Sequence, residues 1–406
     1  MLVALTFAAA MATANLPPPP PLTLAQAVAQ AREASPLRGA AQSLADGSAE
    51  AARLTGRLPN PLIDVRIENL GPASRLTLPR DVFAVVSQPL EIAGKRGLRH
   101  GIAAAERNLA GANLQIVDWQ ITVRTVHLYV QALRSRGLFE TLTANRDGLS
   151  TLIDTMRRRV AEGYAAESDL LKFETESARM DIDIARASLE LERSLGALTF
   201  VIGAAAPIAS EQLVEPESVA APEVAPGSLD GAIARHPELH SAAMRLERAQ
   251  QVAALERARR FPDPVISAGY KRTSGFDTAV AGVTLTVPLF DRNGSAAARA
   301  LGEERAARAE RDAVARRLAS EAAALISTAR ALSQRAARAG RDLLEPADAV
   351  RNAARAAFRE GTADVLKLID AERVHGDVRR TAIELRLEAL TASLEARLAV
   401  GLEILP

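Results

Sequence analysis

The stretch EGYAAESDLLK at residues 162–172 recurs as EGTADVLK at residues 360–367, and this recurrence decides the fold. The two glycines lie 198 residues apart. Three further landmarks recur in the same order, 199 to 203 residues apart: Ser35-Pro36-Leu37 with His236-Pro237-Glu238-Leu239, Leu58-Pro59-Asn60-Pro61 with Phe261-Pro262-Asp263-Pro264, and Gln88-Pro89-Leu90 with Val287-Pro288-Leu289. Because the spacing is kept over nearly the whole chain, we interpret the sequence as an internal repeat of one structural unit.

Each unit is expected to hold a helix, two short strands and a long helical hairpin, which makes the chain mainly α with a small β portion. The first unit covers residues 15–203 and the second covers 228–406, and the proline-rich residues 204–227 connect them. In Ile63–Glu68 apolar and charged residues alternate, as on the two faces of a strand. The four expected strands cover residues 61–70, 81–90, 264–273 and 279–290.

The hairpins are expected to be unusually long. No proline occurs between Pro89 and Pro207. The apolar seam there steps by three and four residues, which is coiled-coil spacing: Ile116, Trp119, Val123, Val126, Val130 and Leu133. A helix over residues 98–160 would run ~95 Å at 1.5 Å per residue, which is too long for a compact domain. Gly163 and Gly361 are expected to end the outgoing helices, with Ser168 and Thr362 as N-caps of the returning ones.

Composition excludes several classes of function. The net charge is +1 and aromatic residues make up 3% of the chain, so there is neither a basic field nor a stacking platform for nucleic acid. There is no cysteine. His236 and His240 are four residues apart, but without a third ligand they are expected to be surface histidines rather than a metal site. No catalytic constellation or phosphate loop is found, so we expect no enzyme activity, no metal and no cofactor.

Membrane insertion, if it occurs, is expected to use strands. Residues 1–14 form an apolar stretch ending in Ala12-Thr13-Ala14, which predicts a signal peptide. No later uncharged apolar run approaches the ~20 residues of a membrane-spanning helix. Four strands per chain cannot close a barrel, whereas three chains would pool twelve. Long helices leaving the same end of each strand pair would then continue the tube.

The order and duplication of these motifs resemble the TolC family of outer-membrane efflux proteins. The resemblance covers residues 22–402 and rests on the strand ends at 87–90 and 287–290, Gly-Lys-Arg at 94–96 and the helix turns at Gly163 and Gly361. It implies a homotrimer with a twelve-stranded β-barrel in the outer membrane of a Gram-negative bacterium, continuous with a long α-helical barrel in the periplasm. It also implies docking to a periplasmic adaptor and an inner-membrane pump.

The segment QPLEIAGKR at residues 88–96 is similar to the branch of that family that serves heavy-metal exporters of the resistance-nodulation-division (RND) type. The resemblance therefore implies a passive exit duct, with heavy-metal cations as one cargo. Protein or peptide export by a type I system and drug efflux stay open, since the pump selects the cargo. From a different class, a soluble periplasmic coiled-coil scaffold also fits the alternating strands and long helices.

The resemblance also assigns roles to particular residues. The turns Glu162-Gly163-Tyr164 and Glu360-Gly361-Thr362 match the tips that contact the adaptor, although they also suit ordinary hairpin turns. Asp169 and Asp364 match the family's tip aspartates, which threefold symmetry would gather into rings at the pore gate, although exposed aspartates near helix starts are common. Lys172 and Lys367 stand where some members carry a second aspartate, and a lysine there would either weaken a cation-selective gate or pair with the aspartate.

The junction between barrel and helices is expected at Gly94-Lys95-Arg96 and Asn293-Gly294. Glycine allows the backbone to change direction there, and the basic pair would lie near the membrane interface. A basic pair exposed on a plain loop is the alternative.

Overall fold

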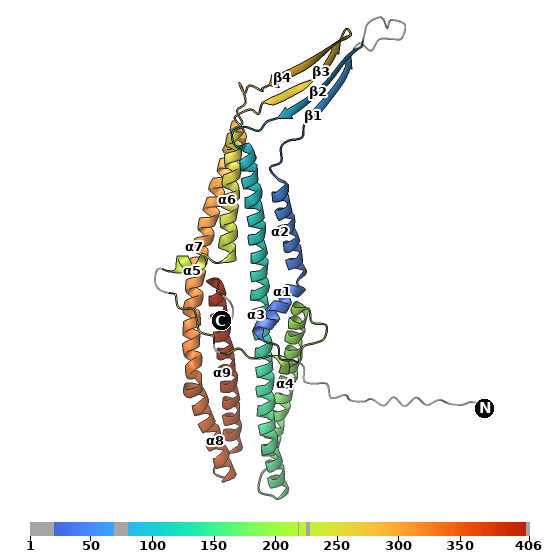
Figure 1. The fold of residues 1–406 in the computed structure, drawn as a ribbon. Helices are drawn as coiled ribbons and strands as arrows, with labels where there is room; N and C mark the ends of the chain where they lie inside the picture. Colours follow the sequence, from blue (N-terminus) through green and yellow to red (C-terminus); the bar gives the residue numbers. More distant parts are fainter. Residues whose placement is uncertain (1–19, 69–79, 218, 225–227, 403–406) are drawn as a thin grey trace, which may run out of the picture.

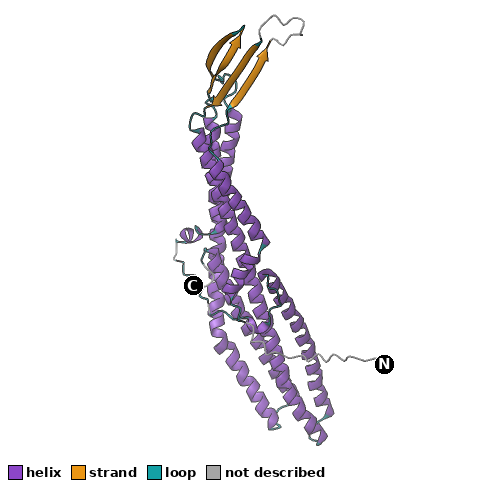
Figure 2. Cartoon of the chain, turned by 45° about the vertical axis from the view of Figure 1, so that its right-hand side comes forward, coloured by secondary structure: helices purple, strands orange, loops and turns teal. Residues whose placement is uncertain are grey.

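The computed structural model describes residues 20–68, 80–217, 219–224 and 228–402, so the expected signal peptide lies outside the described residues. The molecule is elongated, with a four-stranded sheet at one end and two helical hairpins reaching to the other (Figure 1). Figure 2 shows that helices form nearly all of the body between these ends. The expectation of a mainly helical chain with a small antiparallel sheet is confirmed.

The same order of elements occurs twice along the chain. The first half holds α1 (Leu24–Ala34), α2 (Pro36–Leu54), β1 (Leu62–Glu68), β2 (Asp81–Pro89), α3 (Lys95–Ala161) and α4 (Glu167–Ile202). The second holds α5 (Leu229–Ile233), α6 (Pro237–Ala258), β3 (Val265–Thr273), β4 (Phe276–Thr284), α7 (Gly294–Ala339), α8 (Glu345–Arg359) and α9 (Val365–Ala399). A short 3₁₀ turn, η2 (Ser210–Gln212), lies in the connector.

The first helix of each half is broken at the recurring proline. Ser35 caps α2 by accepting a hydrogen bond from the backbone N–H of Arg38, and Pro36 occupies the first helical position. In the second half the ring Nδ1 of His236 accepts from the N–H of Glu238, and Pro237 follows. Proline suits this position because its missing N–H would have no partner within the helix.

The strands form one antiparallel sheet in the order β1-β2-β3-β4. Register places Ile63 beside Val86, Val86 beside Ala268, and Ala268 beside Ala281. Neighbouring residues on the same face are also apolar, and several are exposed: Val65, Ile67, Ile266 and Val283. One face of the sheet is therefore an exposed apolar surface that crosses all four strands.

All four expected strands differ from the structure in their limits, and for β2 and β3 the difference is a single residue, at Pro89 and Val265. The strand expected over 279–290 runs from Phe276 to Thr284, because β3 begins at Val265 and offers β4 no partner beyond Thr284. The strand expected over 61–70 is described from Leu62 to Glu68, and residues 69 and 70 lie outside the described part.

Helix α3 is 67 residues long, or ~100 Å at 1.5 Å per residue. Its predicted seam lies inward: Val126, Val130 and Leu133 are buried, and Trp119 and Val123 pack against the same cluster. In the second half, α7 continues into α8 through a π-helical turn, η3 (Gly340–Leu344). Pro346 follows that turn and cannot donate to a carbonyl one turn back, which explains the local widening.

The connector is held against the middle of the molecule. Leu22 and Leu213 form a parallel bridge. The buried hydroxyl of Tyr129 lies 2.7 Å from the Leu22 carbonyl oxygen and 2.6 Å from that of Val214. Burial raises the pKa of Tyr129 to about 12, so it remains a neutral donor.

Among the described helices, none combines the length and the apolar character that crossing a bilayer would require.

Candidate functional site

The two hairpin tips end their outgoing helices in the same way. Gly163 and Gly361 adopt positive φ of 80° and 75°. The N–H of Tyr164 donates to the Arg159 carbonyl at 2.8 Å, and that of Thr362 donates to the Ala357 carbonyl at 2.9 Å. This is the Schellman arrangement, which satisfies the last carbonyls of a helix and favours glycine. Both tips therefore present short, well-defined turns, with Tyr164 81% exposed.

The expected N-caps of the returning helices are wrong. The N-cap of α4 is Ala166 and that of α9 is Asp364, and neither makes a side-chain capping bond. The Thr362 hydroxyl instead donates to the Ala357 carbonyl at 3.1 Å and so serves the end of the preceding helix. Ser168 lies inside the first turn of α4.

Lys172 and the two candidate gate aspartates lie close together. Lys172 Nζ lies 2.9 Å from Asp169 Oδ1, so the expected pairing of lysine with aspartate is present in the first half. The pKa of Lys172 is raised, first by this hydrogen bond and, more weakly, by the charges of Asp169 and Asp364. Both pairing partners are partly exposed, so the pair adds little stability, but it places a positive charge beside the Asp169 carboxylate.

A small apolar cluster joins the two hairpins behind the tips. Phe173 of α4 meets Phe358 of α8 edge to face, with ring centroids 6.1 Å apart. Arg159 lies over the Phe358 ring and donates to the Arg359 carbonyl at 3.2 Å. Around them the cluster contains Leu149, Ile153, Met156, Val365, Leu368 and Ile369. The two tips are therefore packed against one another within the chain.

Buried carboxylates, each bonded to arginine, lie next to this cluster. Glu176 of α4 accepts two hydrogen bonds from Arg373 of α9, one of them 2.7 Å from Arg373 Nε to Glu176 Oε1. Arg373 holds the pKa of Glu176 below its ordinary value by hydrogen bonding, against the opposing effect of burial. Glu372 likewise accepts hydrogen bonds from Nε and Nη2 of Arg355, with 2.9 Å between Arg355 Nη2 and Glu372 Oε2. Such two-pronged pairs fix geometry as well as charge.

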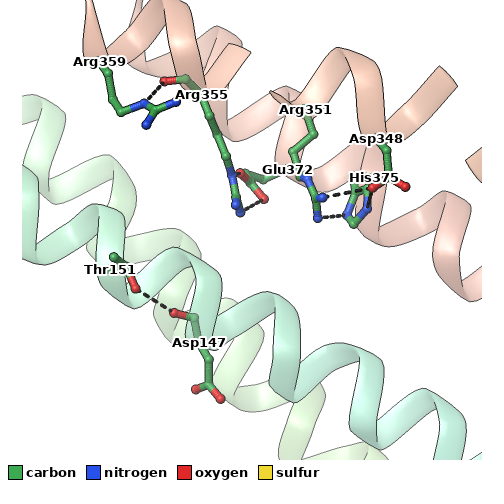
Figure 3. A network of polar contacts seen from close by, with 8 residues as sticks. All are labelled: Asp147, Thr151, Asp348, Arg351, Arg355, Arg359, Glu372 and His375. Atoms are coloured by element: carbon green, nitrogen blue, oxygen red, sulfur yellow. Dashed lines mark hydrogen bonds and ion pairs between the residues drawn. The ribbon is translucent and has the colours of Figure 1, made fainter. Parts of the chain in front are cut away.

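His375 of α9 contacts two further charged residues of α8, Asp348 and Arg351 (Figure 3). His375 is buried, with Nε2 2.9 Å from Asp348 Oδ1 and Nδ1 3.2 Å from Arg351 Nη1. Burial, and then the charge of Arg351, lower the pKa of His375. These residues were not among the functional residues predicted from the sequence. A signal existed, because Glu176 lies between Phe173 and Met180 at seam spacing.

A groove of about 550 Å³ lies between α4 and α9 beside the tips. Leu171 and Leu366 are exposed apolar residues on its two sides, and the Glu176–Arg373 pair lies in its wall. The groove thus combines apolar contact area with fixed charge.

At the sheet end, the junction residues occupy special positions. Gly94 and Asn293 precede α3 and α7 in left-handed conformation, with φ of 74° and 60°. Lys95 is buried, and its Nζ lies 2.9 Å from Asp263 Oδ1, so the expectation of a basic pair exposed on a loop is wrong for Lys95. Arg96 is exposed and donates to the Gly56 carbonyl. The Asn293 amide donates to the Glu256 carbonyl at 2.8 Å, and Gly294 begins α7.

His236 is not the surface histidine that the sequence suggested. It is buried, meets Trp119 edge to face at 4.9 Å, and caps α6. Burial lowers its pKa, which keeps the ring neutral and able to accept. Among the described residues, no three His, Cys, Asp or Glu side chains are grouped so as to hold a metal ion.

Comparisons with known proteins agree with this architecture. Residues 229–402 match the family model "Outer membrane efflux protein". The chain is 28% identical over 360 residues to the cobalt-zinc-cadmium resistance protein CzcC of Cupriavidus metallidurans, covering 87% of this chain and 84% of that protein.

Solved structures share the fold. The outer membrane protein VceC of Vibrio cholerae superposes with a TM-score of 0.75 at 18% identity, covering 94% of this chain and 96% of that one. CusC, whose reported structures concern folding and transmembrane channel formation, superposes with a TM-score of 0.78 at 15% identity, covering 94% and 92%. The family model thus matches the second half of the chain, and the relative and the solved structures match most of its length, so this chain is similar to outer membrane efflux proteins.

Proposed function

We propose that this chain is the outer-membrane channel of a tripartite efflux system, a passive exit duct for solutes that an inner-membrane pump delivers through a periplasmic adaptor. The observation that carries the proposal is the continuity of the exposed apolar sheet with helices of ~100 Å. A sheet of this kind suits a lipid environment, and the helices supply the reach across the periplasm. The chain itself needs no cofactor, since the partner pump supplies the energy.

Three copies are needed to complete the duct. The outer edges of β1 and β4 have no neighbouring strand within the described part of the chain, and lipid does not tolerate open edges. Three copies pool twelve strands, an allowed size for an outer-membrane barrel. A second apolar surface supports assembly: α2, described in full, has no buried residue, and its Leu37 and Leu44 border an apolar groove of about 750 Å³ against α3. A second copy covers this groove.

Heavy-metal cations are the proposed cargo, exported by an RND-type pump. The support is the relative named for cobalt, zinc and cadmium resistance, which aligns over most of both chains. A passive duct requires no resident metal site, because the pump selects what enters.

The hairpin tips are the proposed gate and docking site. Threefold symmetry gathers Asp169 and Asp364 into rings at the pore mouth, with Lys172 neutralising part of their charge. The turns at Glu162–Tyr164 and Glu360–Thr362 meet the adaptor, and docking dilates the mouth. The well-defined turn geometry and the exposure of Tyr164 suit such a contact.

The test combines oligomer size with ion conductance of detergent-purified protein in a planar bilayer. We expect crosslinked trimers and a small, cation-biased conductance that increases several-fold in Asp364→Ala. Asp377→Ala, an exposed aspartate farther along α9, is the matched control and should leave conductance unchanged. A monomer or dimer that stays soluble without detergent and never conducts would replace the duct by a periplasmic scaffold.

Cargo is tested separately in cells that lack their own duct for the cognate pump and adaptor. Expression of this chain should restore resistance to cobalt, zinc or cadmium. Restored export of a drug or a peptide instead, with no change in metal resistance, would keep the channel and reassign its cargo.

A further inference from the structure

The helical path to the second tip passes through a turn with little side-chain packing, the π-helical turn η3 between α7 and α8 (Figure 1). The structure describes all five of its residues, and none of them is buried. A side chain built at Gly340 would meet no neighbouring atom within 4 Å, and Arg341 and Asp342 pair with each other at 3.2 Å. Contacts made by α8 itself must therefore keep it against α9.

One buried ring contacts the first two turns of α8. His375 of α9 is 2% exposed, and its Nε2 lies 2.9 Å from Asp348 Oδ1 of α8. Its Nδ1 lies 3.2 Å from Arg351 Nη1, also of α8 (Figure 3). Arg351 Nη2 donates to the same Asp348 oxygen at 2.9 Å. Three polar side chains thus bind one another and join the beginning of α8 to α9.

Only one state of the ring satisfies all of these contacts. The Asp348 carboxylate accepts hydrogen bonds, so Nε2 of His375 must carry a hydrogen. The Arg351 guanidinium has only donors, so Nδ1 must be free of hydrogen. The ring is therefore neutral. A proton added at Nδ1 would set two donors against each other and place a positive charge beside the guanidinium.

The neighbouring charges on α8 and α9 do not offset that positive charge. Glu372 lies one turn before His375 on α9, but Arg355 of α8 already binds both of its carboxylate oxygens. Arg379 lies one turn after His375 and adds to the positive charge that acts on the ring. Asp348 is the carboxylate that favours the charged ring, and its side chain is 48% exposed. Solvent weakens its effect for that reason.

The other elements packed against α9 bring no free carboxylate to the ring in the part of the chain that the structure describes. On α3, Asp147 points away from the ring, is exposed and lies 3.7 Å from Arg146 (Figure 3). On η3, Asp342 is bound by Arg341. The last turn of α7 carries Arg338, which is exposed. The contact between α8 and α9 therefore depends on a neutral His375.

We propose that His375 holds α8 against α9 while its ring is neutral, and that protonation of the ring lets α8 move away from α9 at the η3 turn. Once α8 has moved, water reaches the ring and Arg351, and both positive charges are tolerated. The inference rests on the proposed duct, in which these helices form part of the mouth. It adds that acid makes the mouth easier to open.

The direction of the pH dependence follows from the same contacts. Burial, and then the charge of Arg351, lower the pKa of His375 below its ordinary value of 6.5. A histidine with a lowered pKa contributes stability that is fully present above its unfolded-state value and is lost as the pH falls toward the lowered one. The contact should therefore hold at pH 7.5 and weaken as the pH falls below 6.5.

His375→Gln tests the role of the proton directly. A glutamine amide offers a donor to Asp348 and an acceptor to Arg351, as the neutral ring does, but it does not titrate. Hydrogen exchange of α8 is compared between the wild type and this variant at the same pH, so that the pH dependence of the chemical exchange step cancels. The two should agree at pH 7.5. At pH 5 the wild type should exchange about tenfold faster, the effect of losing one hydrogen bond to a charged group.

A second variant tests the same idea without replacing the ring. Arg351→Gln keeps a donor for Nδ1 but removes the positive charge beside it, so the acid response should begin at a higher pH than in the wild type. His240→Gln changes an exposed histidine of α6 and is the matched control, which should follow the wild type at every pH. Glu176 does not enter this comparison, because its lowered pKa keeps it ionised above pH 4.5.

The outcomes separate the role of His375 from that of the duct. An acid response of α8 that His375→Gln abolishes, together with a conductance that rises at pH 5 in the wild type and not in the variant, supports the inference. An equal response of α8 in both proteins overturns it, as does an unchanged onset in Arg351→Gln. A conductance that ignores pH while α8 loosens overturns the effect on the mouth. If the chain conducts at no pH, the proposed function fails, while hydrogen exchange still decides what His375 does.

Discussion

The Glu176–Arg373 pair gives the sharpest test of how the two hairpins are held together near their tips. Glu176 lies on α4 and Arg373 on α9, so the pair links hairpins from different halves of the chain. Its two members differ in environment: the Glu176 side chain is 7% exposed and that of Arg373 is 47% exposed. Removing the arginine therefore leaves a buried carboxylate without its cationic partner. Removing the carboxylate leaves an arginine that water can solvate.

The expected effects are unequal for this reason. Removing one partner of a fully buried pair costs about 3–5 kcal/mol, and the partial exposure of Arg373 reduces this to about 2 kcal/mol for Arg373→Gln. Glu176→Gln keeps an acceptor and should cost about 0.5–1 kcal/mol. A change of about 2 kcal/mol corresponds to about 30-fold in the equilibrium for local opening of the tips.

The stability that the Glu176–Arg373 pair contributes should change with pH in a defined direction. The pKa of Glu176 is lowered from its ordinary value of 4.5, chiefly by hydrogen bonds from Arg373. A carboxyl with a lowered pKa contributes stability that is fully present above its unfolded-state pKa and is lost as the pH falls through the folded-state value. The contact should therefore hold at neutral pH, weaken as the pH falls below 4.5 and, once Glu176 is protonated, approach the behaviour of Glu176→Gln.

Hydrogen exchange of α4 and α9 near the tips is the direct assay, with channel conductance as the functional readout. Arg373→Gln should speed exchange there by about 30-fold and raise conductance, while Glu176→Gln has a smaller effect on both. Arg380→Gln, which breaks an exposed pair with Asp377 on the same helix, is the control. Equal effects of Arg373→Gln and Arg380→Gln would refute the reasoning, as would a larger effect of Glu176→Gln than of Arg373→Gln.

Three further changes test other parts of the molecule. Lys172→Met removes a positive charge beside Asp169 and Asp364, so the ratio of cation to anion permeability should rise by about threefold while thermal stability stays constant. An unchanged reversal potential would show that Lys172 does not lie at the pore mouth. Lys95→Met leaves Asp263 without its cation and should destabilise the protein by about 1–2 kcal/mol. An unchanged melting temperature would contradict a stabilising Lys95–Asp263 ion pair at this junction. Tyr129→Phe removes the hydroxyl bonded to the connector and should cost about 1 kcal/mol in urea unfolding, with no change in conductance; a loss of conductance would instead connect the connector to the pore.

Local sequence signals predicted the features that depend on a few neighbouring residues. The turns at Gly163 and Gly361 follow from a glycine placed after a long helical pattern, because positive φ is nearly free for glycine. The breaks before Pro36 and Pro237, at places where a single helix was expected in each unit, also have a local cause, the missing proline N–H. These features need no knowledge of distant parts of the chain.

Features that depend on distant partners were missed. Lys95 is buried because Asp263, 168 residues later, returns to its side, and nothing in Gly94-Lys95-Arg96 signals that partner. The Thr362 N-cap was wrong for a local reason, since the Schellman turn brings the Ala357 carbonyl within reach of the Thr362 hydroxyl. Residues 285–287 alternate like a strand, but a strand also requires a neighbour, and a single chain offers none there.

The two ends of the molecule differ in the side chains that they expose and bury. This difference suits the proposed duct if it opens only at the tips. At the sheet end, the exposed apolar side chains suit lipid, so separating copies would leave the backbone groups of the strand edges unpaired there. At the tip end, carboxylates are buried with arginines. A buried ion pair is often no more stable than an apolar contact of the same size, but its members regain hydration when they separate, whereas apolar groups do not. In the proposed duct, the charged contacts would therefore lower the cost of reversible opening at the tips, while the sheet end would stay assembled.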